Sequence, residues 1–312
     1  MSLSPFIATV VWFPILLSMI PLCAVFQDPV DDWIAETERW RELRERQLRS
    51  ADGWLAVTGL HWLEQDEVRF GSAPDCEIRL AAESSPAEGG RFTVTGGVVL
   101  FTAADGASLR FNGKPAKNGI LTLTGTGPEA DSADRLSIGS STLQLLRRTG
   151  KLAIRIRDSN SGLIRDFPGE RWFPPNQAYR IPARFVAAAP GSSIEFQNVR
   201  GATLSQELAG TVEFEFEGRL WRLQATQDEP GKLFVAFRDQ TSGQQTWPGG
   251  RFLSVDLPKD DTSVVLDFNR AYNPPCAYNP YTLCPLPPSQ NHLSISISAG
   301  ALRPHVSPAG SK

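Results

Sequence analysis

The feature that most constrains this fold is a sequence period of two that begins after residue 65. Apolar and polar residues alternate in short runs such as EVRFG, GRFTVTGGVVLFTA and GILTLTG, and Gly, Asn or Asp separates these runs. Successive side chains of a strand point to opposite faces, so this alternation indicates short strands joined by turns. The 26 glycines and 24 prolines fit many turns. We therefore predict an all-β fold of antiparallel sandwich or barrel units, and not βαβ units.

An internal repeat indicates that there are two such units. GKLAIRIRDSNSG begins at Gly150 and GKLFVAFRDQTSG begins at Gly231, and each copy continues to a Pro-Gly pair and then an arginine. A strand and turn used twice indicate two related β-units. We assign these units to residues 51–173 and 174–302, and we expect residues 303–312 to form a flexible tail.

The turn of each repeat leaves two interpretations open. In the first, Asp158 and Asp239 cap their own turns through hydrogen bonds from side chain to backbone. In the second, both aspartates and the preceding Arg157 and Arg238 line a shared cleft. An Arg-Asp pair at the end of a buried strand is usually a mutual ion pair, so the pattern alone does not indicate a catalytic dyad.

Residues 1–27 differ from the rest of the chain because they carry no charge. The apolar stretch is long enough to cross a bilayer, although Pro14 and Pro21 interrupt it and no Lys or Arg precedes it. We interpret it as an export signal peptide or a membrane anchor; the alternatives are a buried helix and a misassigned start. The interpretation predicts a secreted or anchored cell-envelope protein, in the periplasm or on the outer surface, which contacts the membrane only through this segment.

Residues 28–50 predict one amphipathic helix. Trp33, Trp40 and Leu43 fall near one helical face, and Glu and Arg occupy the others. Acidic residues gather in the first turns and arginines in the last, as the helix dipole favours. We expect this helix to pack on the first β-unit through its tryptophans.

Part of the first β-unit resembles a forkhead-associated sandwich. The likeness rests on FGSAPDCEIRL, RFTVTGGVVLFTAADGASLRFNGKPA and RLSIGSSTLQLL, in that order. The residues that read phosphothreonine in that family have no counterparts here, because no Arg follows Gly71 and no Ser-x-x-His follows IRL. The resemblance therefore implies the shape of that family without its phosphopeptide binding.

The stretch LDFNRAYNPPCAYNPYTLCPLPPSQNHL, residues 266–293, predicts an ordered loop between two strands, the second being LSISISAG. Prolines fix φ and remove backbone donors, and asparagines supply local hydrogen bonds. Cys276 and Cys284 are spaced for a disulfide across a small loop, which we expect in an exported protein. The alternatives are a metal site with His292 and a nucleophilic cysteine activated by His292.

The same loop carries a second resemblance. Together with GWLAVTGLHWL, FRDQTSG, GGRFL and NHL, it is similar to a bacterial and archaeal family catalogued as domain of unknown function 1684. The likeness spans roughly residues 50–300, implies an all-β architecture and brings no established activity. The chain departs from the family pattern at 290–293, QNHL in place of Glu-Asn-Arg-Leu, and at 299–302, AGAL in place of Ala-Gly-Glu-Lys.

Several functional classes lack support in the sequence. G-x-S-x-G, H-E-x-x-H, a phosphate loop and a dinucleotide fingerprint are all missing from it. A net charge of −3 argues against nucleic-acid binding. We predict no cofactor and no metal, and we expect an unidentified small molecule as the partner.

The first functional hypothesis is a ligand-binding module. Its pocket is formed by the 266–293 loop and the 238–252 segment, where tyrosines and a tryptophan offer flat contacts and polar residues orient the ligand. The candidate ligand-binding residues are Arg238, Trp247, Asn269, Tyr272, Asn273, Tyr278, Tyr281 and Asn291.

The alternative is a hydrolase-like enzyme in the same pocket. Asp239 or Asp267 would act as the general base beside Arg251 or Arg270. Asp267 directly follows the apolar VVL run, and a carboxylate at a strand end beside an ordered loop suits catalysis. In the competing interpretation, Asp267 and Arg270 only cap and lock the loop.

Overall fold

The computed structural model describes residues 29–124, 130–257 and 262–305. The expected export signal or anchor, residues 1–27, and most of the expected tail lie outside these ranges. Within them, no helix combines the length and the apolar character that a bilayer crossing requires.

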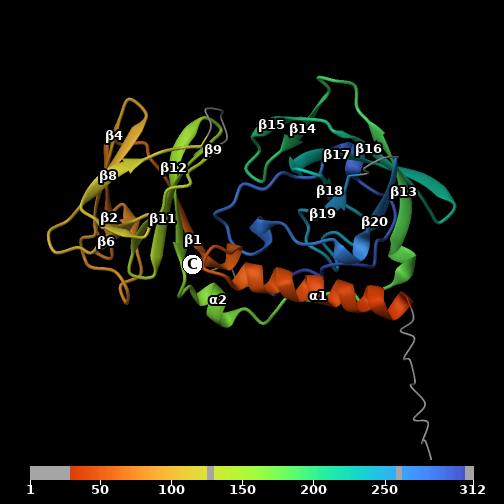
Figure 1. Cartoon of the computed structure of the whole chain (residues 1–312), viewed down its shortest axis with the longest axis horizontal. Coiled ribbons are helices and arrows are strands. Elements are labelled where there is room, and N and C mark those ends of the chain that lie inside the picture. Colours follow the sequence, from red (N-terminus) through yellow and green to blue (C-terminus); the bar gives the residue numbers. More distant parts are fainter. Residues whose placement is uncertain (1–28, 125–129, 258–261, 306–312) are drawn as a thin grey trace, which may run out of the picture.

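The all-β prediction is confirmed. Two strand-rich units lie side by side, and a long helix, α1 (Pro29–Arg49), runs along the second one (Figure 1). A short helix, α2 (Gly162–Asp166), follows the last strand of the first unit, and Ser161 caps it by accepting a hydrogen bond from the Leu163 amide.

The first unit packs two sheets face to face. One sheet has the order β1 (Val57–Trp62), β12 (Lys151–Asp158), β11 (Ser141–Arg148), β10 (Leu136–Ile138), β6 (Leu109–Phe111) and β7 (Lys114–Ala116), with β9 (Ala130–Asp131) beside β11. The other has the order β3 (Ile78–Arg79), β2 (Glu67–Gly71), β4 (Gly90–Thr95), β5 (Val98–Ala103) and β8 (Asn118–Leu121). Alternating apolar residues such as Phe70, Phe92 and Phe101 fill the space between them.

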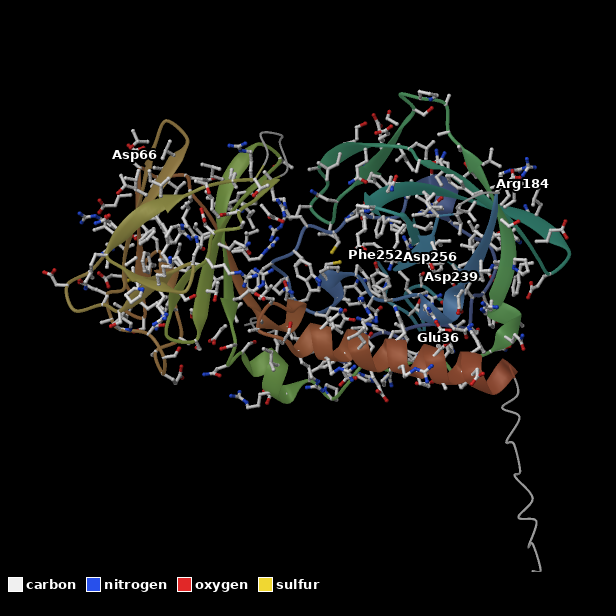
Figure 2. The ribbon with its side chains drawn as sticks, viewed as in Figure 1. Glu36, Asp66, Arg184, Asp239, Phe252 and Asp256 are labelled. Carbon is white, nitrogen blue, oxygen red and sulfur yellow. The ribbon has the colours of Figure 1, made fainter. Side chains whose placement is uncertain are left out.

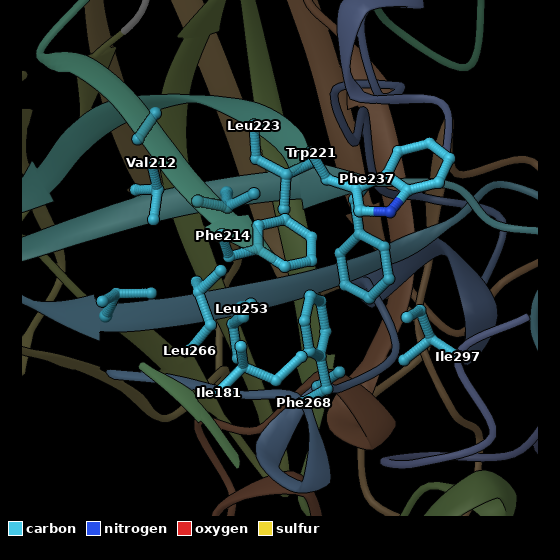
Figure 3. Close-up of a cluster of buried hydrophobic side chains, with 14 of the residues drawn as sticks. Ile181, Val212, Phe214, Trp221, Leu223, Phe237, Leu253, Leu266, Phe268 and Ile297 are labelled. Carbon is cyan, nitrogen blue, oxygen red and sulfur yellow. The ribbon is translucent and has the colours of Figure 1, made fainter. Parts of the chain in front are cut away.

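The second unit is a curled antiparallel sheet. Its order is β19 (Arg251–Asp256), β18 (Lys232–Phe237), β17 (Arg219–Glu229), β16 (Gly210–Phe216), β13 (Arg180–Ala187) and β20 (Ser263–Asp267). The hairpin of β14 (Ser193–Gln197) and β15 (Thr203–Glu207) stands beside this sheet. The sheet wraps around a core that includes Phe214, Phe237 and Phe268 (Figure 3).

The expectation that α1 packs on the first unit is wrong for most of its length. Trp40 contacts the rings of Trp172 and Tyr272, and Trp33 Nε1 donates to Asp267 Oδ2 at 3.1 Å. Arg41 donates to the carbonyl oxygens of Phe173 and Asn269. Irregular segments have no neighbouring strand to satisfy their carbonyls, and the arginines of α1 supply those hydrogen bonds.

The expected strand LSISISAG is also wrong. In residues 293–300, Leu293, Ile295, Ile297 and Ala299 alternate into the core, yet the chain bends and no strand forms there. The carbonyls of Ile297 and Ala299 accept hydrogen bonds from the side chain of Arg251. A buried side chain thus takes the place of a neighbouring strand.

Candidate functional site

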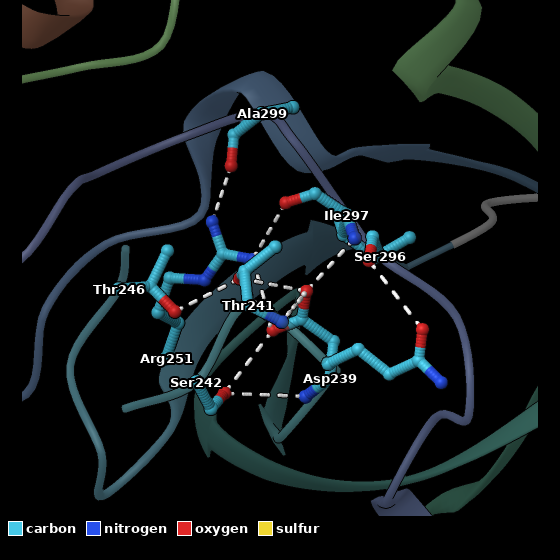
Figure 4. Close-up of polar contacts among 9 residues, drawn as sticks. Asp239, Thr241, Ser242, Thr246, Arg251, Ser296, Ile297 and Ala299 are labelled. Carbon is cyan, nitrogen blue, oxygen red and sulfur yellow. Dashed lines mark hydrogen bonds and ion pairs between the residues drawn. The ribbon is translucent and has the colours of Figure 1, made fainter. Parts of the chain in front are cut away.

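The turn of the second repeat is built on a buried ion pair. Arg251 Nη2 lies 3.3 Å from Asp239 Oδ1, and neither side chain is exposed to solvent. Asp239 Oδ2 also accepts from the Ile297 amide at 2.8 Å and from the Thr241 hydroxyl at 2.8 Å (Figure 4). Burial lowers the pKa of Arg251, and the Asp239 carboxylate opposes that shift.

This geometry does not support the hydrolase hypothesis. Asp239 and Arg251 hydrogen-bond to each other, to neighbouring backbone groups and, for Asp239, to the Thr241 hydroxyl. Both side chains are buried, so a substrate does not reach them. Asp267 caps the 3₁₀ turn η3 (Phe268–Arg270) by accepting from the Asn269 amide, and its other oxygen lies 3.7 Å from Arg270 Nε. The interpretation that Asp267 and Arg270 lock the loop fits these contacts.

The prediction that the repeat aspartates cap their turns is confirmed. Asp158 Oδ1 accepts from the Asn160 amide at 2.9 Å, and Asp239 accepts from the Thr241 amide at 3.3 Å. The shared-cleft alternative fails because Arg157 donates to Gln144 Oε1 inside the first unit, whereas Arg238 lines a cavity of the second.

The three asparagines proposed as ligand contacts are all fully buried and tie the loop to its surroundings. Asn269 Nδ2 donates to the Asn176 carbonyl, and its Oδ1 accepts from the Asn176 amide. Asn273 Nδ2 donates to Glu170 Oε1 and to the Leu302 carbonyl. Asn291 bridges the backbones of Gln224 and Ala236. These side chains replace ladder hydrogen bonds, so they are not available to a ligand.

A cavity of about 710 Å³ lies where the 266–293 loop meets the 238–252 segment. We call it the Trp247 pocket. Its size falls within the range of small-molecule sites. It is lined by Arg171, Gln244, Gln245, Trp247, Cys276, Ala277, Tyr278, Asn279, Pro280, Leu302, Arg303, Pro304 and His305.

The Trp247 pocket combines two arginines and a histidine. Arg171, Arg303 and His305 line it, and none of the described lining residues is Asp or Glu. Arg303 places its guanidinium 5.7 Å from the ring centre of Trp247. Arg171 Nη2 contacts only a carbonyl oxygen, that of Arg303, at 3.5 Å. Within the described residues, neither arginine forms an ion pair, so both are available for an anion.

A half-buried carboxyl, Glu170, stands behind the wall of the pocket. Tyr278 Oη donates to Glu170 Oε2 at 2.7 Å, and Asn273 Nδ2 donates to Oε1 at 2.6 Å. Burial raises the pKa of Glu170, and the two donors oppose that shift. Burial beside this carboxyl also raises the pKa of Tyr278 well above its usual value.

Of the predicted ligand-binding residues, the structure brings only Trp247 and Tyr278 to this pocket. Arg238 lines a second cavity, of about 640 Å³, next to the β14–β15 hairpin. Tyr281 lines a third cavity, beside α2, and Tyr272 a fourth, under Arg44. The predicted set is therefore spread around the Pro/Asn-rich loop.

Sequence reasoning missed Arg171, Arg303 and His305. Arg171 had a detectable signal, because it occupies the second position after Pro-Gly, where the second repeat has Arg251. Arg303 and His305 fall in the segment expected to be a flexible tail, which carries no local pattern.

The predicted disulfide is not formed, since Cys276 and Cys284 are both free thiols. The Cys276 amide donates to Cys284 Sγ at 3.1 Å, so the two residues are nevertheless adjacent. His292 lines the cavity beside Arg238, away from Cys276, and its Nε2 lies 3.2 Å from the Pro287 carbonyl oxygen. In the described part of the chain, no group of three or more His, Cys, Asp or Glu residues is arranged to hold a metal ion.

Fold and site thus define a two-unit β-protein with a basic pocket against its Pro/Asn-rich loop. Residues 165–301 match the family model described as protein of unknown function (DUF1684). The solution structure of an uncharacterised protein from Haloarcula marismortui is 35% identical, over 44% of this chain and 78% of its own, with a TM-score of 0.38. The chain belongs to the DUF1684 family.

Forkhead-associated domains are also among the similar solved structures. One, studied for phosphothreonine-dependent interactions, is 14% identical over 31% of this chain and 92% of its own, with a TM-score of 0.21. Another, the FHA-2 domain of a Mycobacterium tuberculosis ABC transporter, is 22% identical over 32% of this chain and 81% of its own, with a TM-score of 0.22. No curated protein matches the chain.

Proposed function

We propose that this protein binds a small anionic molecule with a flat apolar part in the Trp247 pocket. The observation that carries the proposal is the pairing of an indole face with two arginines that have no acidic partner among the described residues. Guanidinium groups bind carboxylates and phosphates with paired hydrogen bonds, and an indole stacks on planar groups. Gln244 and Gln245 add neutral donors and acceptors at the rim.

Binding is favoured over hydrolysis by what surrounds the pocket. The aspartates that could act as general bases, Asp239 and Asp267, make structural hydrogen bonds elsewhere. The Glu170 carboxyl stands behind Tyr278, which uses its hydroxyl to bind it. Two arginines, with no Asp or Glu among the described lining residues, favour holding an anion over activating a water molecule.

The proposal is tested by thermal unfolding with matched ligands. Phenyl phosphate and benzoate supply an anion and a ring, and benzamide supplies the ring alone. At a hundredfold excess over Kd, a ligand of the folded state contributes about 2.7 kcal/mol to the free energy of unfolding. We expect the anions to stabilise the wild type and not Arg303→Ala.

The control variant is Arg184→Ala. Arg184 is an exposed arginine at the outer edge of the second unit (Figure 2), so its loss should leave the stabilisation intact. Equal stabilisation of wild type and Arg303→Ala, or an equal response to benzamide, would contradict the proposal.

We further propose that the protein works in the cell envelope, exported or anchored through residues 1–27. The support is the uncharged apolar character of that segment. Fractionation of cells that produce the full chain tests this proposal. Deleting residues 2–27 should move the protein to the cytoplasmic fraction, and an unchanged distribution would contradict it.

A further inference from the structure

Two thiols meet at the wall of the Trp247 pocket. Cys276 lies in the 3₁₀ turn η4 (Pro275–Ala277) and lines the pocket, partly exposed. Cys284 lies behind it, 4% exposed, among Ala236 and Phe252. The Cys276 amide donates to Cys284 Sγ at 3.1 Å, which holds the second sulfur next to the first residue.

The indole of Trp247 is fixed beside Cys276. Both residues line the pocket, and Trp247 is among the groups that lower the pKa of Cys276. Gly249 makes this position possible, because a Cβ there would lie 2.8 Å from Trp247 Nε1. One sulfur therefore lies at the pocket beside the indole, and the other is buried.

We infer that Cys276 and Cys284 form a redox-active dithiol, in which Cys276 is the peroxide-reactive thiol and Cys284 resolves it. The division of roles follows from access, since Cys276 opens onto the pocket and Cys284 does not. A structural pair would not need one member at a cavity wall.

The electrostatics agree with these roles. Hydrogen bonds from Cys284 and Trp247 lower the pKa of Cys276, against the effect of burial. The hydrogen bond to Cys276 and burial raise the pKa of Cys284, which stays protonated until its partner has reacted. The positively charged Arg171 and Arg303 line the same pocket, as does His305, and Glu170 lies behind Tyr278. Burial raises the pKa of Cys76, the remaining described cysteine.

The oxidant is a hydroperoxide. The Cys276 thiolate attacks its terminal oxygen, an S–O bond forms, and the O–O bond breaks to release hydroxide or alkoxide, which takes a proton from water. The Cys284 sulfur then attacks Cys276, the S–S bond forms, and the S–O bond breaks. The departing hydroxide takes the Cys284 proton and leaves as water, so two thiols lose two hydrogens and the peroxide gains two electrons.

This inference does not rest on the proposed anion binding. Hydrogen peroxide is neutral, so Arg303→Ala should lose stabilisation by phenyl phosphate and still form the disulfide. Failure of one proposal therefore leaves the other intact.

The test uses the full chain with Cys23→Ser, reduced and then treated with one equivalent of hydrogen peroxide. We expect the intact mass to fall by two hydrogens, and peptide mapping to join residues 276 and 284. Adding Cys284→Ser should stop the reaction at a sulfenic acid on Cys276 that dimedone labels. Adding Cys276→Ser should abolish oxidation, and adding Cys76→Ser should change nothing.

A second measurement, the rate of cysteine alkylation, uses a protein in which Cys276 and Cys284 are both intact. Iodoacetamide should alkylate Cys276 at least about tenfold faster than Cys76 at neutral pH, because the thiolate is the nucleophile. Trp247→Phe should move the pH profile of Cys276 alkylation upward and slow it about tenfold at neutral pH, since it removes the indole that lowers the pKa of Cys276. Trp62→Phe, in the first unit, is the matched control.

Three results would overturn the inference. The first is a protein whose 276–284 link survives excess dithiothreitol, which would make it a structural disulfide. The second is Cys76 reacting as fast as Cys276. The third is a Cys276 alkylation profile that Trp247→Phe leaves unchanged.

Discussion

The two copies of the repeat begin alike and end differently. Each strand leads to an aspartate that caps its turn, and each copy later presents an arginine after a Pro-Gly pair. Arg251 points inward and pairs with Asp239 in the core. Arg171 points outward and lines the Trp247 pocket. One short sequence thus builds the interior of one unit and the wall of a pocket.

The cause of the difference is strand pairing. Arg251 is the first residue of β19, and it pairs with Phe237 at the end of β18, so its side chain is held beside the turn of its own copy. Arg171 lies in an irregular segment, and its neighbour Trp172 bridges to Ala301 at the far end of the chain. The register of β18 and β19 therefore explains why Arg251 pairs with the aspartate of its own repeat and Arg171 does not.

The largest expected effect comes from breaking the inward pair. Arg251→Ala leaves Asp239 charged in the core without its partner, which costs about 3–5 kcal/mol in the free energy of unfolding. It also frees the carbonyls of Ile297 and Ala299, which Arg251 holds. Urea denaturation followed by tryptophan fluorescence measures the loss, and a change below about 1 kcal/mol would refute the structural role.

The next largest effect concerns Asn273, in the 266–293 loop, which contacts Glu170 beside Arg171. Asn273→Ala removes donors to Glu170 and to the Leu302 carbonyl, at a cost of about 1–3 kcal/mol. Leu302 lies between the core and the pocket arginine Arg303, so the same variant should weaken phenyl phosphate binding. Denaturation and titration of one sample test both, and intact stability would show that the loop does not depend on this residue.

A pH effect sharpens the comparison further. Burial raises the pKa of Glu170 above its unfolded value of about 4.5, so the folded state holds this proton more tightly. The stability that this group contributes is complete below the unfolded pKa, and it is lost as the pH rises through the folded pKa. Glu170→Gln should remove this fall.

Other groups titrate in the same pH range, so the quantity to follow is the difference in stability between wild type and Glu170→Gln. Burial also raises the pKa of Asp228, which acts in the same direction in both proteins. Denaturation midpoints from acidic to neutral pH should converge at the acidic end and separate as the pH rises. Parallel curves would show that Glu170 keeps an ordinary pKa.

The smallest effect on stability belongs to the outward arginine. Arg171→Ala removes an exposed side chain without an ion pair among the described residues, so the free energy of unfolding should change by less than about 0.5 kcal/mol. A loss similar to that of Arg251→Ala would erase the difference between the copies.

Local patterns predicted the strands, the helix and the capped turns because each depends on neighbours along the chain. Phe70 and Phe92 alternate as strand residues should, and Trp33 and Trp40 share a helical face. The direction in which that face packs was not predictable, because its partners, Trp172 and Tyr272, come from distant segments.

The site was only half predictable for the same reason. The two segments that form the pocket, 238–252 and 266–293, have a distinctive composition. Trp247 and Tyr278 were predicted from that composition. Arg171 and Arg251 follow the same Pro-Gly signal, and only the pairing of β18 with β19 separates them. In LSISISAG, the alternation of residues correctly predicted which side chains are buried. It could not predict that the Arg251 side chain, and not a neighbouring strand, binds the carbonyls of this segment.

The central claim is that Arg171 serves an anion and Arg251 serves the core. Calorimetric titration of phenyl phosphate into wild type, Arg171→Ala and Arg184→Ala tests it most directly. We predict similar Kd values for wild type and Arg184→Ala, and a Kd at least about tenfold weaker for Arg171→Ala, the loss of one charge-assisted hydrogen bond. Equal affinity in all three proteins, or no heat in any, would contradict the account.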